Sequence, residues 1–262
     1  MKRVKLAPLM IALVAFTHYQ LVIAQDTTPP NWQVIAEYPH PSHAFTQGLN
    51  YVNGELVETT GKHGLSRVLR YAPGELPSGS VATLPKQYFG EGSVVIGDQL
   101  LWLSWQRGQA FWIDLNTGNR RNAFRYDHEG WGLALSPDQS EIVVSDGSDS
   151  LRIWNHQGEL QRTISVRQGV YSWHYLNELE WVGNTIFAFV WMNEKLLAIN
   201  ANSGEVMQSY DLAGLRDIQG EQQRITRHHT LNGIAFDPED GHFFVTGKNW
   251  STLYKLKLEG WE

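Results

Sequence analysis

The chain has 262 residues, a formal net charge of −6 at neutral pH and no cysteine. Its acidic balance excludes the basic surface typical of nucleic-acid-binding proteins and the polybasic patch that binds anionic membranes, and the absence of cysteine excludes thiol catalysis, disulfides and cysteine-ligated metals. Eleven tryptophans and 24 glycines favour short strands, tight turns and an aromatic-lined interior over a helix bundle.

The first 24 residues have the pattern of a secretory signal peptide. Three basic residues precede an apolar run at 6–16, and the small-residue sequence Val-Ile-Ala ends at residue 24. The alternative, an uncleaved membrane anchor, is disfavoured because the apolar run is too short to span a bilayer comfortably. We therefore expect an exported protein, periplasmic or secreted, whose mature domain covers residues 25–262 and is not attached to the membrane.

A single motif recurs five times between residues 44 and 248. Each copy has a short strand that opens on the motif, a polar turn, and a second strand rich in β-branched and aromatic residues. The copies align at Gly48, Gly92, Gly132, Glu178 and Gly233. The intervals between these residues are 44, 40, 46 and 55. This is the period of propeller blades, since a four-stranded blade repeats at about 40 to 50 residues.

Each copy continues with a third strand, and four of the copies continue with a fourth, such as SVATLPKQY at 80–88. The fifth copy ends at Glu262 without one, and residues 31–40 can supply it and so hide the open edges. The sequence therefore predicts an all-β, five-bladed propeller in one domain, closed by an N-terminal strand that completes the last blade. The connection at 211–230 is long, and we expect a rim segment near the channel mouth with room for one helical turn.

In a propeller the first strand of each blade lines the central channel, so equivalent positions form rings. The position before each aligned residue is occupied by Gln47, Glu91, Trp131, Asn177 and Asn232. The ends of the second strands add a second layer, which comprises Thr60, Trp105, Asp146, Trp191 and Lys248. Polar groups are costly to bury without partners, and a lone Glu and a lone Lys among tryptophans favour the perturbed pKa values typical of catalytic sites. The pattern predicts a functional channel centred on Glu91.

Simpler interpretations remain open for individual residues. Glu91 and Lys248 are compatible with a structural ion pair between two blades, and the tryptophans with ordinary packing. Asp146, in the sequence SDGSD, is typical of a turn, and His228 and His229 have no partner at metal-ligand spacing. The sequence contains no HExxH, GxSxG or P-loop signature in the required context.

Nine short motifs occur in order from 44 to 248: AFTQGL, FGEG, LSW, EGWGL, SDG, LNELE, FVW, LNGIA and VTGK. With this series the chain resembles the plant and bacterial type of glutaminyl cyclase, also called glutamine cyclotransferase, over nearly the whole mature sequence. The resemblance implies a five-bladed propeller that converts the N-terminal glutamine of peptides to pyroglutamate with loss of ammonia, and that is distinct from the zinc enzyme of animals. It implies no cofactor and no metal, peptides or proteins with N-terminal glutamine as partners, and a monomer. Gln25, exposed by signal cleavage, would itself be a substrate.

The resemblance also implies site residues. Glu91 and Lys248 are the catalytic groups, with Glu91 as the general acid/base. The substrate-binding contacts are Phe45, Gln47, Phe89, Trp105, Trp131, Asn177, Trp191 and Asn232. Two departures are present: the segment ELVETTGKHG differs from the ESTG of the family, and the cysteines of plant members are missing. Neither departure affects the channel residues.

Cyclisation requires a neutral α-amine, and that amine, with a pKa of about 8, is mostly protonated at neutral pH. Glu91 can accept its proton and pass it to the departing ammonia. Lys248 and the amides of Asn177, Asn232 and Gln47 can donate to the developing oxyanion.

Two other functions fit part of the pattern. A metal-dependent, lactonase-like propeller would use Glu91, Asn177, Asn232 and Asp146 as oxygen ligands of a divalent cation, although the ammonium of Lys248 would repel that cation. A non-catalytic propeller would bind peptides by stacking on the tryptophans. The cyclotransferase interpretation differs from both because it requires turnover without a metal.

Overall fold

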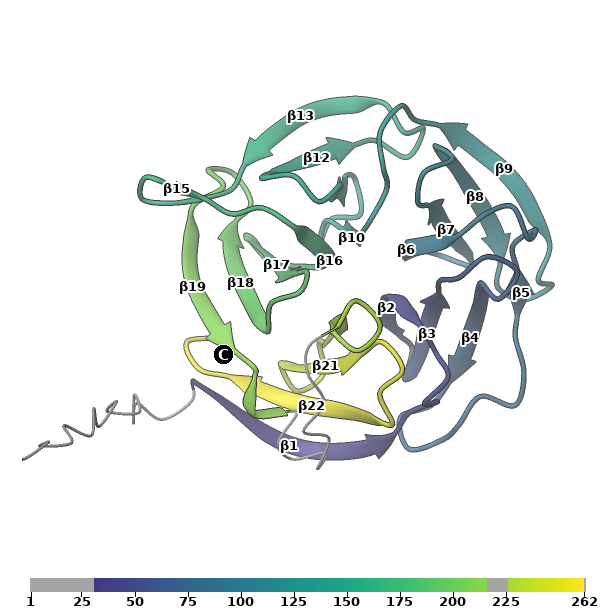
Figure 1. The fold of residues 1–262 in the computed structure, drawn as a ribbon, viewed down its shortest axis with the longest axis horizontal. Coiled ribbons are helices and arrows are strands. Elements are labelled where there is room, and N and C mark those ends of the chain that lie inside the picture. The colour runs from purple at the N-terminus through teal and green to yellow at the C-terminus, as the bar shows by residue number, and fades with distance from the viewer. Residues whose placement is uncertain (1–30, 216–225, 262) are drawn as a thin grey trace, which may run out of the picture.

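The computed structural model describes residues 31–215 and 226–261. In this part of the chain, five four-stranded sheets surround a central axis, as Figure 1 shows. This arrangement confirms the predicted five-bladed propeller. No helix in the described ranges is long and apolar enough to cross a membrane. The predicted signal peptide, residues 1–24, lies outside the described residues.

Each of the first four blades is built from one stretch of chain, and the fifth combines both ends. Blade 1 contains β2 (Thr46–Val52), β3 (Glu55–Thr60), β4 (Arg67–Tyr71) and β5 (Ala82–Thr83). Blade 2 contains β6 (Gly90–Ile96), β7 (Gln99–Ser104), β8 (Gln109–Asp114) and β9 (Arg120–Arg125). Blade 3 contains β10 (Leu133–Leu135), β11 (Ile142–Val144), β12 (Ser150–Trp154) and β13 (Leu160–Ser165). Blade 4 contains β16 (Leu176–Val182), β17 (Thr185–Val190), β18 (Lys195–Asn200) and β19 (Val206–Asp211). Blade 5 contains β20 (Leu231–Asp237), β21 (His242–Gly247), β22 (Thr252–Leu258) and β1 (Trp32–Pro39).

In blade 5 the strand order is β1-β22-β21-β20, so β1 is the outermost strand. It pairs antiparallel with β22, with Trp32 opposite Leu258 and Pro39 opposite Thr252. In Figure 1 the purple β1 runs along the yellow β22. The segment that leaves β1 therefore enters blade 1 beside the loop that follows β21, where Lys248 lies.

Two details differ from the sequence prediction. The fourth strand of blade 1, expected at 80–88, is reduced to β5, because Pro85 has no amide hydrogen with which to extend the ladder. A small hairpin of β14 (Arg167–Gln168) and β15 (Tyr171–Ser172), which the sequence did not predict, projects beyond blade 3 (Figure 1). The connection at 211–230, for which one helical turn was expected, includes residues 216–225, which lie outside the described ranges.

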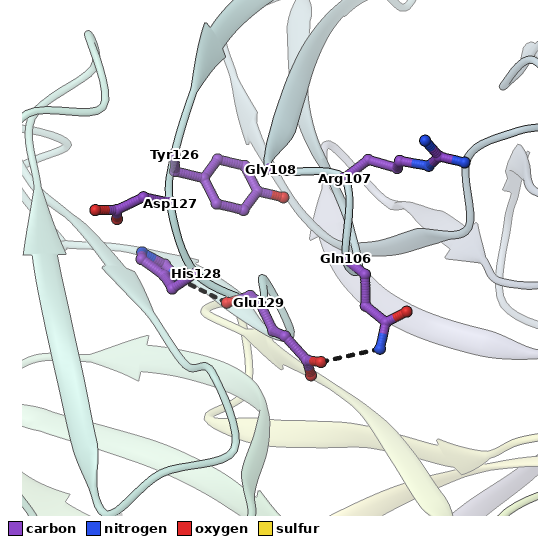
Figure 2. Close-up of a pocket in the computed structure, with 7 residues that line it drawn as sticks. All are labelled: Gln106, Arg107, Gly108, Tyr126, Asp127, His128 and Glu129. Atoms are coloured by element: carbon purple, nitrogen blue, oxygen red, sulfur yellow. Dashed lines mark hydrogen bonds between the residues drawn. The ribbon is translucent and has the colours of Figure 1, made fainter.

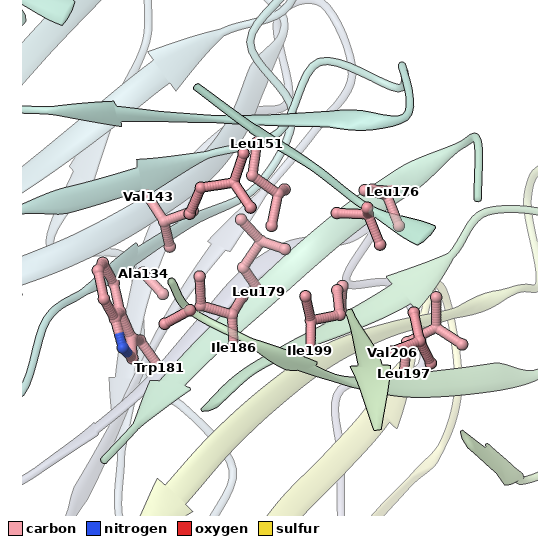
Figure 3. Packing of buried hydrophobic residues seen from close by; sticks show 14 of the residues in the cluster. Ala134, Val143, Leu151, Leu176, Leu179, Trp181, Ile186, Leu197, Ile199 and Val206 are labelled. Atoms are coloured by element: carbon pink, nitrogen blue, oxygen red, sulfur yellow. The ribbon is translucent and has the colours of Figure 1, made fainter. Parts of the chain in front are cut away.

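The hydrophobic core consists of five clusters, one in each seam between neighbouring blades. Figure 3 shows the seam between blades 3 and 4. Strand β17 illustrates the cause: every one of its residues is buried, and successive side chains point to opposite faces. Ile186 and Ala188 pack in the seam with blade 3, whereas Phe187 and Phe189 pack in the seam with blade 5. Strand β17 is therefore apolar from Ile186 to Val190, and the stacked blades form a rigid frame around the channel.

Candidate active site

Irregularities in the innermost strands position the polar side chains of the channel. The pairing of each inner strand with its neighbour shifts register at the same place in four blades. The residues within these shifts include Gln47, Glu91, Asn177 and Asn232. In blade 3 the inner strand starts only after Trp131, whose amide donates to the Ser145 carbonyl at 2.9 Å. Such bulges redirect side chains and are common beside active sites.

The two glycines around Glu91 are required by close backbone packing. A Cβ on Gly90 would lie 2.5 Å from the Trp102 ring, and one on Gly92 would lie 2.5 Å from the Trp131 carbonyl oxygen. The Gly92 amide donates to that carbonyl at 2.7 Å. The FGEG sequence thus brings blades 2 and 3 together and leaves Glu91 as the side chain that enters the channel.

One cavity of about 330 Å³ at the channel mouth unites most of the predicted site. The predicted residues that line it are Phe45, Gln47, Phe89, Glu91, Trp105, Trp131, Asn177, Trp191 and Lys248. Arg227 and His228, which were not predicted as site residues, line it as well. All five blades therefore contribute to a single pocket.

The Glu91 carboxylate is almost completely buried, with 5 % of the residue exposed. Its Oε2 accepts a hydrogen bond from Gln47 Nε2 at 2.5 Å, and its backbone carbonyl accepts from Thr59 Oγ1 and Trp102 Nε1, both at 3.0 Å. Burial raises the pKa of Glu91 to about 8, although the charge of Lys248 and the Gln47 hydrogen bond oppose the rise. A backbone fixed on both sides thus presents a carboxyl group that can exchange a proton near neutral pH.

Lys248 faces Glu91 from the end of β21 and is equally buried, with 5 % exposed. Burial lowers the pKa of its ammonium to about 8, and the charge of Glu91 opposes this change. Its Nζ lies 5.0 Å from the centre of the Phe45 ring. Within the described ranges Lys248 forms no ion pair, so the structural ion pair considered above is not seen, and the two groups interact across the cavity.

Asn232 does not line the cavity, in contrast to the predicted substrate contact, but lies directly beneath it. Its Nδ2 donates to Gln47 Oε1 and to the Thr46 carbonyl, each at 2.8 Å. This contact fixes the Gln47 amide with its oxygen towards Asn232 and its NH2 group towards Glu91. Asn232 therefore supports the site through Gln47.

Aromatic rings form the walls. The Trp131 and Trp191 rings meet edge to face with centroids 5.8 Å apart, and the Phe89 and Trp105 rings do so at 5.7 Å. Such tilted pairs are the favoured arrangement of aromatic side chains. They leave a rigid, largely apolar cleft around the two ionisable groups.

Glu129, which was not predicted as a site residue, holds two of these walls. Its Oε2 accepts from Trp105 Nε1 at 2.7 Å and from Trp131 Nε1 at 3.0 Å. Its Oε1 accepts from Gln106 Nε2 at 3.1 Å, as Figure 2 shows. The EGWGL motif contained the signal, because Glu129 stands two residues before a channel tryptophan, but its partner Trp105 comes from another loop.

Two residues of the predicted second layer lie outside the cavity. Asp146 accepts from the Ser148 amide at 3.0 Å and forms an ion pair with Arg152 at 3.0 Å, so it stabilises a turn. Thr60 Oγ1 accepts from the Arg67 amide at 3.1 Å within blade 1. The oxygen set considered for a lactonase-like metal site is therefore not assembled. Among residues 31–215 and 226–261, no group of three His, Cys, Asp or Glu side chains is arranged to hold a metal ion.

Comparison with known proteins gives consistent matches. A family model described as glutamine cyclotransferase matches residues 7–258. The chain is 35 % identical over 234 residues to the glutaminyl-peptide cyclotransferase of Arabidopsis thaliana, covering 87 % of this chain and 71 % of the relative. The crystal structure of Myxococcus xanthus glutaminyl cyclase superposes with a TM-score of 0.78 at 30 % identity, covering 87 % of this chain and 96 % of that one.

Proposed function

The chain belongs to the glutamine cyclotransferase family, and we propose that it converts N-terminal glutamine of peptides to pyroglutamate with Glu91 as the group that moves the proton. The observation that carries this assignment is the state of Glu91. It is buried in the cavity and has one side-chain donor, Gln47, and its pKa of about 8 matches that of an N-terminal amine. Proton transfer between two groups of equal pKa is nearly balanced, which suits a general base that must later act as an acid.

The reaction forms one bond and breaks one. The neutral α-amine of the glutamine attacks its own side-chain carbonyl carbon, and the carboxamide nitrogen leaves as ammonia. Glu91 accepts a proton from the amine and returns it to the leaving nitrogen, so the enzyme ends each cycle in its starting state. A relay of this kind contributes roughly 10²- to 10⁴-fold to the rate.

Lys248 and Asn177 provide the complementary electrostatics. Both line the cavity that contains Glu91, and both are buried. Their N–H groups can donate to the oxyanion that develops on the carboxamide oxygen, where a buried donor acts without solvent reorganisation. Because burial lowers the pKa of Lys248 to about 8, only part of the enzyme carries a charged ammonium on the alkaline side of neutrality.

The aromatic walls hold the substrate side chain in a compact conformation and exclude water from it. An extended glutamine keeps its amine away from its carboxamide, and the ring closure needs both in contact. The Trp131–Trp191 and Phe89–Trp105 pairs restrict the side chain to a compact conformation and so supply part of the entropy of cyclisation.

The assignment is tested by ammonia release from a short peptide that begins with glutamine. We expect release that resists a strong chelator and that falls about 10²- to 10⁴-fold in Glu91→Gln. Binding of the peptide without release would instead support the non-catalytic propeller, and release abolished by the chelator would support the metal-dependent alternative.

We also propose that residues 1–24 are a signal peptide and that the mature protein is a periplasmic or secreted monomer. The basic start and apolar run of the sequence support export, and the pairing of β1 with β22 leaves that blade edge occupied. The expected mass is that of a chain that starts at Gln25. It is lower by the mass of one ammonia if the enzyme cyclises its own N-terminus. An intact leader in the exported fraction, or a dimer in sedimentation analysis, would contradict these points.

A further inference from the structure

A second hollow, of about 190 Å³, adjoins the catalytic cavity. Phe45 lines both, so the two spaces meet at this residue. The far side of the hollow is formed by the turn after β3 and the start of β4, with Lys62, Leu65 and Arg67. A substrate whose glutamine occupies the cavity thus has a neighbouring space within reach of its next residues.

The hollow carries positive charge. Lys62 Nζ lies 4.7 Å from the centre of the Phe45 ring, whereas Lys248 Nζ approaches the same ring from the cavity at 5.0 Å. Arg67 borders the hollow, and its Nε donates to the Leu65 carbonyl at 3.2 Å. The ring is therefore bordered by one ammonium group from each space.

These cations are not neutralised within the described part of the chain. Several other basic side chains are paired: Arg70 with Glu55, Arg162 with Glu141 and Lys255 with Asp237. No carboxylate in the described ranges forms an ion pair with Lys62 or Arg67. Two unpaired cations around a partly apolar hollow suit a ligand that brings its own carboxylate.

The backbone of Lys62 is held in an unusual conformation. Its φ of 80° lies in the left-handed region, which a lysine rarely adopts. Its carbonyl accepts hydrogen bonds from the Ser66 hydroxyl at 2.8 Å and the Ser66 amide at 3.0 Å. The same hydroxyl accepts from the Gly90 amide at 2.9 Å, next to Glu91. The turn that presents Lys62 is therefore anchored to the strand that carries the acid/base group, and strain of this kind concentrates at functional sites.

We propose that this hollow is a substrate subsite, in which Lys62 and Arg67 bind a carboxylate carried by the residues that follow the N-terminal glutamine. The inference rests on the proposed function, because it places the glutamine in the adjoining cavity. The carboxylate comes from an aspartate or glutamate at the second or third position, or from the C-terminus of a short peptide. Leu65, and Leu69 deeper in the hollow, contact the aliphatic part of such a side chain.

The test compares peptides that differ only in charge. We expect kcat/KM for ammonia release to be about 2- to 5-fold higher with Gln-Asp-Ala-amide than with the isosteric Gln-Asn-Ala-amide, since an exposed ion pair gives an effect of this size. High ionic strength should reduce the ratio. In the double variant Lys62→Met with Arg67→Gln the ratio should fall to about one.

The control variant is Arg121→Gln, which removes an exposed cation from the outer strand of blade 2 and should keep the ratio. Gln-Ala-Asp-amide, and Gln-Ala with a free or amidated C-terminus, show which source of carboxylate the hollow accepts. Equal kcat/KM for the aspartate and asparagine peptides, or a ratio that survives the double variant, would overturn the subsite.

A binding measurement distinguishes failure of this inference from failure of the proposed function. The dissociation constants of the same peptides are measured on Glu91→Gln by quenching of tryptophan fluorescence. A charge preference in binding that disappears in the double variant supports the subsite even if the wild-type enzyme releases no ammonia. If the enzyme turns over all peptides with no charge preference in kcat/KM or in the dissociation constant, the proposed function is supported and the subsite is contradicted.

Discussion

Two buried glutamates in neighbouring blades differ in the partners that surround them. Glu58, in β3, is completely buried; it accepts from Thr46 Oγ1 at 2.7 Å and from Tyr71 OH at 2.8 Å, and it forms an ion pair with His40 at 3.3 Å. Burial alone would raise its pKa, but the charge and hydrogen bond of His40 and the two hydroxyl donors lower it below the usual range. Glu91 is as deeply buried, and its pKa is raised to about 8.

The difference lies in the number of donors. Glu91 receives one hydrogen bond from a neutral amide, and its cation, Lys248, stands across the cavity. Glu58 has a cation in contact and two hydroxyls, and so remains charged at all moderate pH values. A buried carboxylate with a single neutral donor is thus available for proton transfer, whereas one with donors on both oxygens and a cation in contact stays charged and stabilises the fold.

The largest effect should follow from breaking the cluster of Glu58. We expect Glu58→Gln to lower the free energy of unfolding by about 3 to 5 kcal/mol, because it leaves the buried His40 without its carboxylate. Denaturant unfolding followed by tryptophan fluorescence measures the change. His40→Ala with Glu58→Gln is the control, since removing both partners should cost less than the sum of the single changes.

Removal of the cation opposite Glu91 should instead affect the reaction. Lys248→Met keeps a chain of similar length in the cavity but removes its N–H donors. We expect kcat to fall about 10²- to 10³-fold, the usual cost of one oxyanion donor. The unfolding midpoint should not fall, because Lys248 has no ion pair among the described residues. A variant that loses stability but keeps its turnover would show that Lys248 stabilises the fold, as Glu58 does, and does not take part in the reaction.

The two glutamates should also respond oppositely to pH. The folded-state pKa of Glu91 is raised to about 8 from an ordinary 4.5, so its ionisation opposes folding increasingly as pH rises through this interval. Glu91→Gln should therefore match the wild type near pH 4 and be more stable by about 1 to 3 kcal/mol at pH 8. Unfolding free energies measured across this range test the sign. If the variant is less stable at pH 8, the carboxylate is a stabilising charge.

Glu58 has the opposite pH dependence, and its partner His40 limits the stabilisation on the alkaline side. The pKa of His40 is raised and that of Glu58 is lowered, so the stabilisation is fully present between the ordinary values of the two groups, about pH 4.5 to 6.5. It is lost as pH falls through the folded pKa of Glu58, and also as pH rises through the folded pKa of His40.

The same contrast shows what the sequence could predict. Glu91 was identifiable because its glycine neighbours and its place in a fivefold repeat mark an acid where the other blades have amides or an indole. Glu58 was not, because its partner His40 belongs to the segment after β1 and meets β3 only when the first and last blades come together. Repeats encode the ring and its inner positions, but contacts between loops of different blades have no sequence period.

Arg227 and His228 were missed for the same reason. They line the cavity from the connection before β20, which has no counterpart in the other blades. Asn232, predicted as a substrate contact, is absent from the residues that line the cavity and contacts Gln47, since the repeat specifies which side chains face the axis but not their depth. The order of elements and most of the side chains that line the cavity were thus predictable, whereas contacts between loops of different blades were not.

The smallest effect should come from Glu129, which links the tryptophan walls to the charge of Glu91. Its negative charge is the weakest of the influences that raise or lower the pKa of Glu91, and it acts to raise it. Glu129→Gln should therefore shift the acidic limb of the pH profile of kcat/KM slightly towards lower pH, because this limb reports the pKa of the free enzyme's base.

Glu129→Ala should in addition raise KM about 3- to 10-fold, since Trp105 and Trp131 lose their shared acceptor. Gln106→Ala, which touches only the other oxygen of Glu129, is the control that should change neither quantity. A purely structural Glu129 would lower the unfolding midpoint in both variants and leave the pH profile in place, whereas a shifted profile with an unchanged midpoint would show that the outer carboxylate tunes the inner one.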